Sequence, residues 1–206
     1  MSAVTKAAGF LAAFALFARC APGTFYFEDS PELLATAAAL GNSHEPGYPL
    51  LMCLGRLALA VPVGAPAFRF NLMIAACGAG AATVLGALAA GIAAAWGVRG
   101  AAAVGVFAAG LWALSDAAWW ECVIGDKYAP YYLTFLLLVA AAWRLARSAP
   151  DLVPRRLAAV ALLTGVAFAH HQYSLFAAPA IGAALLRLRG LGFRRGARLA
   201  LLGAAL

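Results

Sequence analysis

Four side chains that can take part in acid–base chemistry or bind a metal lie within seventeen residues near the start of the chain: Asp29, Glu32, His44 and Glu45. A carboxylate or an imidazole in such a cluster can accept a proton from a hydroxyl that is about to react. These groups are also ligands for divalent cations, but their spacing matches no recognised ligand motif. We therefore expect acid–base chemistry, assign no metal, and leave a divalent metal as an open alternative.

The residues around Asp29 predict a short helix over residues 31–40. Asp29 or Ser30 is suited to the N-cap, Pro31 fits the first turn, and a Gly-Asn pair follows as a stop signal. Asp29 and Glu32 then have the spacing of a capping box, in which one carboxylate binds backbone N–H groups and the other reaches back. From the local sequence, this structural interpretation and the catalytic one are evenly balanced.

The segment HEPGYP at 44–49 predicts a rigid turn, because two prolines flank a glycine and a tyrosine. A second helix is expected over residues 50–61, ending at Pro62. It carries Arg56 among apolar residues, which favours a helix lying along a membrane surface.

The composition of the whole chain excludes a soluble globular domain. Of its 206 residues, 65% are hydrophobic and 11% charged, and the mean hydropathy is +0.88. The net charge of +7 does not indicate a nucleic-acid partner, since no basic residues alternate with aromatics in a stacking groove. The four cysteines show no CxxC spacing and are interpreted as isolated small apolar residues.

Runs of about 20 apolar residues between charges predict an all-α integral membrane protein, a multi-span helical bundle. The predicted spans cover residues 7–21, 70–96, 100–118, 128–143, 157–169 and 174–186, with the start of another at 199. A long outer loop, residues 22–69, would contain the short interfacial helices. The first span could also be a signal peptide. Because the chain stops within an apolar run, we expect it to be the N-terminal part of a longer protein.

The segments 157–169 and 174–186 are short for spans and could instead form one long helix across the polar residues 170–173. Arginine clusters lie on both sides of the pair. The positive-inside rule places both clusters in the cytoplasm, which requires two crossings.

Charge placement also predicts the orientation of the chain in a cell membrane. With a cytoplasmic N-terminus, eleven of the fifteen Lys and Arg residues lie inside, and seven of the eight acids lie outside. The active face of this multi-pass protein is therefore expected outside.

The stretch from Phe27 to Leu72 resembles a known family. It reads FEDSPEL, then an Ala-rich helix, LGNSHEPGYPL, LGRL and PAFRFNL. This order is similar to the DUF2723 family of GT-C-type membrane glycosyltransferases, which is related to protein O-mannosyltransferases. Pro31 stands where the family has glycine, and Glu45 stands where it has proline.

Two later stretches resemble the same family more weakly. WWECVIGDKYAPYYLTF places Asp126 at the family's acidic position and Tyr128 at its tyrosine, with Lys127 in place of an apolar residue. AFAHHQYSLFAAPA aligns His171 with the family histidine. Family members are usually several hundred residues long.

The resemblance implies a GT-C bundle that transfers a sugar from a polyprenyl-phosphate donor to a hydroxyl of a protein or glycan on the outer face. Asp29 would be the catalytic base and Glu32 a second catalytic residue, and cations would bind the departing lipid phosphate. The residues predicted to bind substrate are His44, Glu45, Tyr48, Arg56, Arg69, Asp126, Lys127, Tyr128 and His171.

Two other functions remain open at this point: a polytopic transporter and a non-catalytic membrane subunit. Transporters place charges at mid-membrane, whereas the interiors of the long predicted spans here carry none. This distribution favours surface chemistry on a lipid substrate.

Overall fold

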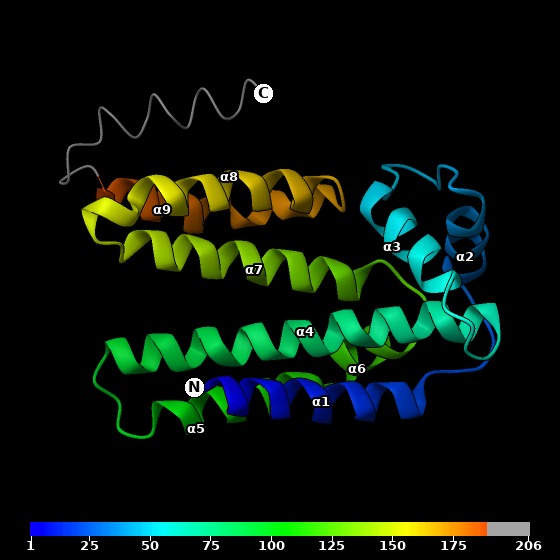
Figure 1. Ribbon diagram of the computed structural model, residues 1–206, viewed down its shortest axis with the longest axis horizontal. Coiled ribbons are helices and arrows are strands. Elements are labelled where there is room, and N and C mark those ends of the chain that lie inside the picture. Colours follow the sequence, from blue (N-terminus) through cyan, green and yellow to red (C-terminus); the bar gives the residue numbers. More distant parts are fainter. Residues whose placement is uncertain (189–206) are drawn as a thin grey trace. The chain divides into compact units, whose positions relative to one another are not determined.

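The computed structural model describes residues 1–188, which form helices and no strand. Contacts divide the chain into two compact units, Met1–Leu133 and the residues from Thr134 onward. The first unit contains α1 (Ala3–Cys20), α2 (Ser30–Ala39), α3 (Pro49–Leu59), α4 (Pro66–Ala95), α5 (Ala101–Ala113) and α6 (Asp116–Val123) (Figure 1). The helix α7 (Tyr128–Ala146) begins in the first unit. It is followed by η1 (Pro150–Leu152), α8 (Val153–Phe168), η2 (Gln172–Ala177) and α9 (Ala178–Leu188).

The 30-residue helix α4 organises the first unit, because α1, α3, α5 and α6 all pack against it (Figure 1). Its contact with α5 depends on small residues. A Cβ atom added at Gly105 would lie 2.4 Å from the carbonyl oxygen of Gly86 and 2.8 Å from the Cβ of Ala90. The two backbones therefore touch at a distance that only glycine permits.

The short helices α2 and α3 pack on each other, and α3 packs on the start of α4. The ring of Phe70 is almost completely buried there, in one core with Leu33, Ala37 and Leu51. A Cβ at Gly55 would lie 2.5 Å from the Phe70 ring and 2.8 Å from the Cβ of Ala37. Burial of such side chains, worth roughly 1.5–3 kcal/mol each, holds α2 in place beside α4.

One buried polar side chain fixes the connection between α1 and α2. The Asn71 amide nitrogen donates to the carbonyl oxygens of Pro22 at 2.9 Å and Thr24 at 3.2 Å. Because a buried amide is costly without partners, these bonds hold the loop that leads to Asp29 against α4.

Three helices in the part of the chain that the structure describes are long and apolar enough to cross a membrane: α1, α4 and α7. The pair α5 and α6 passes the same test together, but the two helices are bent by 70°. The described residues are thus all helical, with three to four candidate membrane-spanning helices, and the six predicted spans stay a prediction.

The predicted helices over 31–40 and 50–61 are confirmed as α2 and α3, with ends shifted by one or two residues. The predicted span over 100–118 is interrupted in the structure, because α5 ends at Ala113. The Ser115 hydroxyl donates to the Trp112 carbonyl, and Ser115 is the N-cap of α6, with Asp116 in the first turn. Serine followed by aspartate favours the start of a new helix over continuation of the old one.

The second unit has its own apolar core, made by residues such as Leu138, Leu145 and Leu157. The helix α8 has 16 residues and α9 has 11 in its described part, so both are short for spans, as the sequence indicates. The predicted span start at 199 lies outside the described residues.

Candidate functional site

The side chain of Asp29 is not used as a helix cap. Asp29 occupies the N-cap position of α2, and its backbone carbonyl accepts from the Leu33 amide at 2.9 Å, but its carboxylate makes no capping hydrogen bond. The residue before it, Glu28, has a positive φ of 64° and turns the chain into the helix. The capping-box interpretation is therefore wrong, and the carboxylate is available for other partners.

Glu32 binds His44 instead of reaching back to the start of its own helix. One carboxylate oxygen accepts from the His44 backbone N–H at 2.6 Å, and the other lies 3.0 Å from Nδ1 of the ring. The hydrogen bond from the backbone N–H of His44, followed by the one to its ring, lowers the pKa of Glu32 below its usual value. Glu32 therefore connects α2 to the turn before α3 as an ionised group at neutral pH.

The turn that presents His44 requires glycine. The Gly47 amide donates to the His44 carbonyl at 2.8 Å, and Gly47 has a φ of +74°. A Cβ at this position would lie 2.6 Å from Oδ1 of Asn42. The segment 44–49 is thus the tight turn that its sequence predicts.

Lys127 joins two carboxylates from distant parts of the chain. Its ammonium group forms a hydrogen-bonded ion pair with Asp29 and lies 3.3 Å from Oδ1 of Asp126. The Asp126 side chain is only 6% exposed and that of Lys127 11%, whereas Asp29 is 33% exposed. Burial by itself would lower the pKa of Lys127, but the hydrogen bond to Asp29 and the charge of Asp126 outweigh it and raise the pKa above its usual value.

Close packing at Gly125 brings Lys127 to the start of α2. A Cβ at Gly125 would lie 2.8 Å from the Phe70 ring and 3.0 Å from both Oδ1 of Asn71 and Oγ of Ser30. The segment before α7 therefore lies directly on the first turns of α2 and α4. A side chain at residue 125 would push Lys127 away from Asp29.

His44 links Asp29 with Tyr48. Its Nε2 lies 3.3 Å from the Tyr48 hydroxyl and 3.7 Å from Oδ2 of Asp29. Because an ionised Glu32 only accepts hydrogen bonds, Nδ1 of His44 donates to it, and Nε2 faces Tyr48 and Asp29. Burial raises the pKa of Tyr48, so its hydroxyl stays protonated and can donate. His44, Tyr48 and Asp29 are thus three groups that can exchange protons and that lie side by side.

The cluster has some features of a metal site. Ligand atoms of Asp29, Glu32 and His44 lie within 4.8 Å of one another, and oxygen with imidazole suits a divalent cation. The Lys127 ammonium already supplies positive charge to Asp29, and Nδ1 of His44 is already bonded to Glu32. We therefore assign no metal to these residues.

Two predicted phosphate ligands have structural partners. Arg56 donates to the carbonyl of Ala38 near the end of α2, and Arg69 donates to the carbonyls of Leu59, Val63 and Gly64. Their roles toward a lipid phosphate stay predictions.

The other predicted residues lie as follows. Tyr128 lies beside the cluster, with its ring centroid 4.9 Å from the Lys127 ammonium. Glu45 is exposed and has no hydrogen bond or ion pair within the described part of the chain. His171 belongs to the second unit, where its Nδ1 accepts from the Tyr173 amide at 3.1 Å.

Sequence reasoning missed two residues of this site. Gly125 allows the segment before α7 to pack closely on α2 and α4, and no local sequence pattern indicates this role. Glu121 is part-buried on α6, and its Oε2 is buried without a hydrogen-bond partner among the described residues. Its position five residues before Asp126, on a tryptophan-rich helix, was the available signal.

Apolar helices of spanning length, joined to a cluster of acids, a histidine and a lysine at their ends, define an integral membrane protein with a candidate enzymatic site. Residues 29–190 match the sequence model described as the protein O-mannosyl-transferase TMEM260 N-terminal domain, and the chain belongs to this family. The matched region begins at Asp29 and includes all the clustered residues.

A curated relative agrees with this family. The chain is 32% identical over 127 residues to the protein O-mannosyl-transferase TMEM260 of Mus musculus, which covers 61% of this chain and 17% of the relative. No solved structure matches the chain. The predicted relation to O-mannosyltransferases is thus confirmed, and it indicates a glycosyltransferase, whereas the DUF2723 and GT-C designations remain predictions.

Proposed function

We propose that this chain forms the acidic part of the active site in a GT-C-type membrane glycosyltransferase. The enzyme transfers a sugar from a polyprenyl-phosphate donor to a hydroxyl of a protein or glycan acceptor on the outer face of the cell membrane. Because the aligned part is 17% of the TMEM260 relative, further parts of the machinery are expected elsewhere in a longer protein.

The observation that carries the proposal is the state of the Asp29 carboxylate. It sits at the start of α2 but makes no capping bond, is one-third exposed, and pairs with Lys127 from 98 residues further along the chain. A carboxylate needed only for helix stability would bind the backbone of α2. The long-range pairing favours a role in chemistry.

In the proposed reaction, Asp29 accepts the proton of the acceptor hydroxyl as the hydroxyl oxygen bonds to the anomeric carbon of the sugar. The bond from that carbon to the phosphate oxygen breaks, and its electron pair leaves with the lipid phosphate. Lys127 orients the Asp29 carboxylate before the acceptor arrives. Glu32 acts through His44, whose Nε2 faces both Asp29 and Tyr48, and we treat Glu32 as a positioning residue.

The test replaces Asp29 by asparagine in the full-length protein and measures transfer from a radiolabelled polyprenyl-phosphate sugar. General-base catalysis predicts a loss of about 10² to 10⁴ in turnover with donor binding retained. If Asp29 serves only as the structural partner of Lys127, the variant should lose thermal stability but keep its turnover per folded molecule. The matched control is Asp116→Asn, an exposed acid in the first turn of α6, which should keep full turnover.

Three outcomes would contradict the proposal. Turnover retained by the Asp29→Asn protein would exclude Asp29 as the base. Absence of transfer by the wild-type protein, with the donor shown to bind, would favour the non-catalytic subunit. Movement of a labelled solute across vesicles would favour the transporter.

A further inference from the structure

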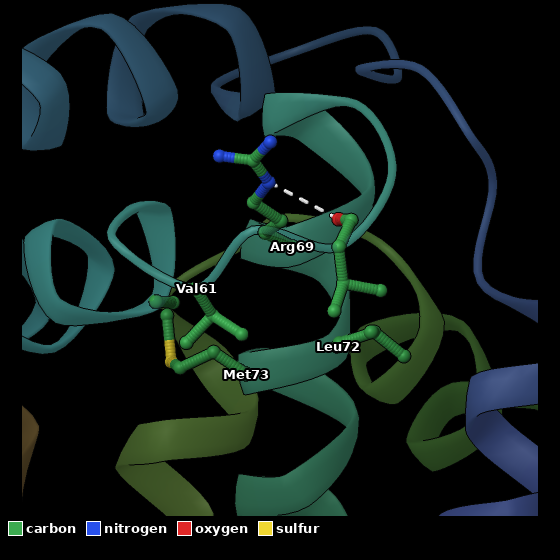
Figure 2. Close-up of a pocket in the computed structure, with 6 residues that line it drawn as sticks. Val61, Arg69, Leu72 and Met73 are labelled. Carbon is green, nitrogen blue, oxygen red and sulfur yellow. Dashed lines mark hydrogen bonds between the residues drawn. The ribbon is translucent and has the colours of Figure 1, made fainter.

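A small apolar pocket lies between the end of α3 and the first turns of α4. Its volume is about 230 Å³, and it is lined by Ala58, Val61, Val63, Leu72, Met73 and Arg69. Figure 2 shows Val61, Leu72 and Met73 around the opening, with the Arg69 guanidinium directed away from Val61 and Met73. The pocket is below the roughly 300 Å³ typical of sites for whole small molecules, so it suits a segment of hydrocarbon chain.

Arg69 brings a positive charge to this apolar pocket without a counter-ion. Its guanidinium donates to three carbonyls, and no carboxylate of the described residues forms an ion pair with it. These contacts use three of the five N–H groups of the guanidinium, which leaves two donors for an anionic group. The planar guanidinium can bind a phosphate group through two N–H donors.

The position of the pocket indicates that its occupant comes from the bilayer. Arg69 lies in the first turn of α4, a candidate membrane-spanning helix, so the pocket is at a membrane boundary. Apolar side chains around it are strongly exposed: Leu57 by 68%, Val61 by 51% and Val63 by 47%. Exposed apolar groups at this depth favour contact with lipid tails over contact with water.

The pocket is separate from the Asp29 site. Arg69, Leu72 and Met73 line the pocket, whereas Phe70 and Asn71 contact Gly125 beside the catalytic cluster. Residues 69, 72 and 73 share one side of α4, because each residue advances by about 100° around a helix. A donor phosphate at Arg69 would therefore face a different side of α4 from Asp29.

We propose that this pocket binds an anionic phospholipid of the surrounding bilayer, with a tail segment between α3 and α4 and its phosphate on Arg69. The lipid would stabilise the loop between α3 and α4, because it adds an anion to a cation that already holds two loop carbonyls and the carbonyl of Leu59 at the end of α3. The site goes beyond the proposed transferase function and does not depend on it.

The experiment measures the thermal unfolding of the purified full chain in dodecyl maltoside micelles with phosphatidylglycerol or phosphatidylcholine of identical tails. A ligand that binds only the folded state raises Tm with its concentration. The wild-type chain should show an affinity for phosphatidylglycerol about tenfold higher than for phosphatidylcholine. Ala58→Leu, which fills the pocket, should abolish the shift with both lipids.

Charge variants test the role of Arg69. Arg69→Gln should remove the preference for phosphatidylglycerol. Arg69→Lys, which keeps the positive charge, should retain part of this preference. Arg19→Gln, an exposed arginine at the end of α1, is the matched control and should keep the preference. Ala35→Leu, on the exposed face of α2, controls for added apolar volume.

The proposal is overturned if the two lipids give equal shifts, or if Ala58→Leu keeps the full shift. It is also overturned if undecaprenyl phosphate shifts Tm and phosphatidylglycerol does not, since the pocket would then belong to the donor. None of these readouts uses sugar transfer, so failure here leaves the proposed function unchanged.

Discussion

At the scale of single residues, the site depends on how few charges the chain has and how they are paired. Lys127 pairs with Asp29 on one side and with Asp126 on the other, and its positive charge reduces the repulsion between the two acids. Asp126 is the buried member, with 6% of its side chain exposed, whereas the Asp29 side chain is 33% exposed to solvent. The pair Glu32 and His44 then closes the other side of Asp29.

Glu32→Ala should loosen the turn at 44–49 without unfolding α2, because alanine favours helix and only the two bonds to His44 are lost. In wild type, the lowered pKa means that these bonds are fully present above the usual glutamate pKa and are lost as pH falls through the lowered value. Deuterium uptake at pH 7 of the peptide that contains His44 should rise in the variant.

Glu45→Gln is the matched control for this turn, since Glu45 is exposed and holds nothing in the described part of the chain. It should leave uptake at the wild-type level. Equal uptake in the Glu32→Ala protein and the wild type would show that Glu32 does not hold the turn.

At the scale of helices, glycines decide how the elements that carry the site pack. Gly55 on α3 lets that helix approach both Phe70 of α4 and Ala37 of α2, and Gly125 lets the segment before α7 reach α2. These contacts place three distant segments around Asp29. Hydrophobic periodicity alone would not distinguish these glycines from those on open surfaces.

Gly55→Ala should destabilise the first unit by about 1–3 kcal/mol, the usual cost of overpacking, because its Cβ would overlap the Phe70 ring and the Ala37 methyl. Gly110→Ala on α5 is the control. A Cβ there meets nothing within 4 Å, and alanine is favoured in a helix by roughly 0.5–1 kcal/mol. Denaturant unfolding in detergent measures both. A Gly55→Ala protein as stable as the Gly110→Ala protein would contradict the packing seen here.

At the scale of the whole molecule, the spans and the charges together predict how the chain lies in a membrane. The helices α1, α4 and α7 are the strongest candidates, and the bent pair α5 and α6 gives a fourth crossing only if it spans as a unit. The basic residues after α7 and before α8 favour a cytoplasmic position for that connection. The Asp29 cluster is then expected on the opposite side.

A glycosylation acceptor placed after Gly41, in the exposed loop between α2 and α3, should be modified from the outer side. An epitope placed after Pro150, exposed in η1, should be reached by antibody only after permeabilisation. Detection of the Pro150 epitope on intact cells would overturn the orientation and the outward placement of Asp29.

The sequence by itself determined the class of the protein, because composition and long apolar runs reflect transfer into lipid, which is a property of each segment alone. It also located α2, α3 and the turn at 44–49, since proline, glycine and capping residues act over a few positions. It could not decide whether the side chains of Asp29 and Glu32 cap their own helix or bind distant partners. That choice depends on Lys127 and His44, and only tertiary packing through Gly125 and the start of α4 brings these partners within hydrogen-bond distance. The break between α5 and α6 was also missed, because the long run of apolar residues favoured one span although Ser115 and Asp116 are typical of a helix start.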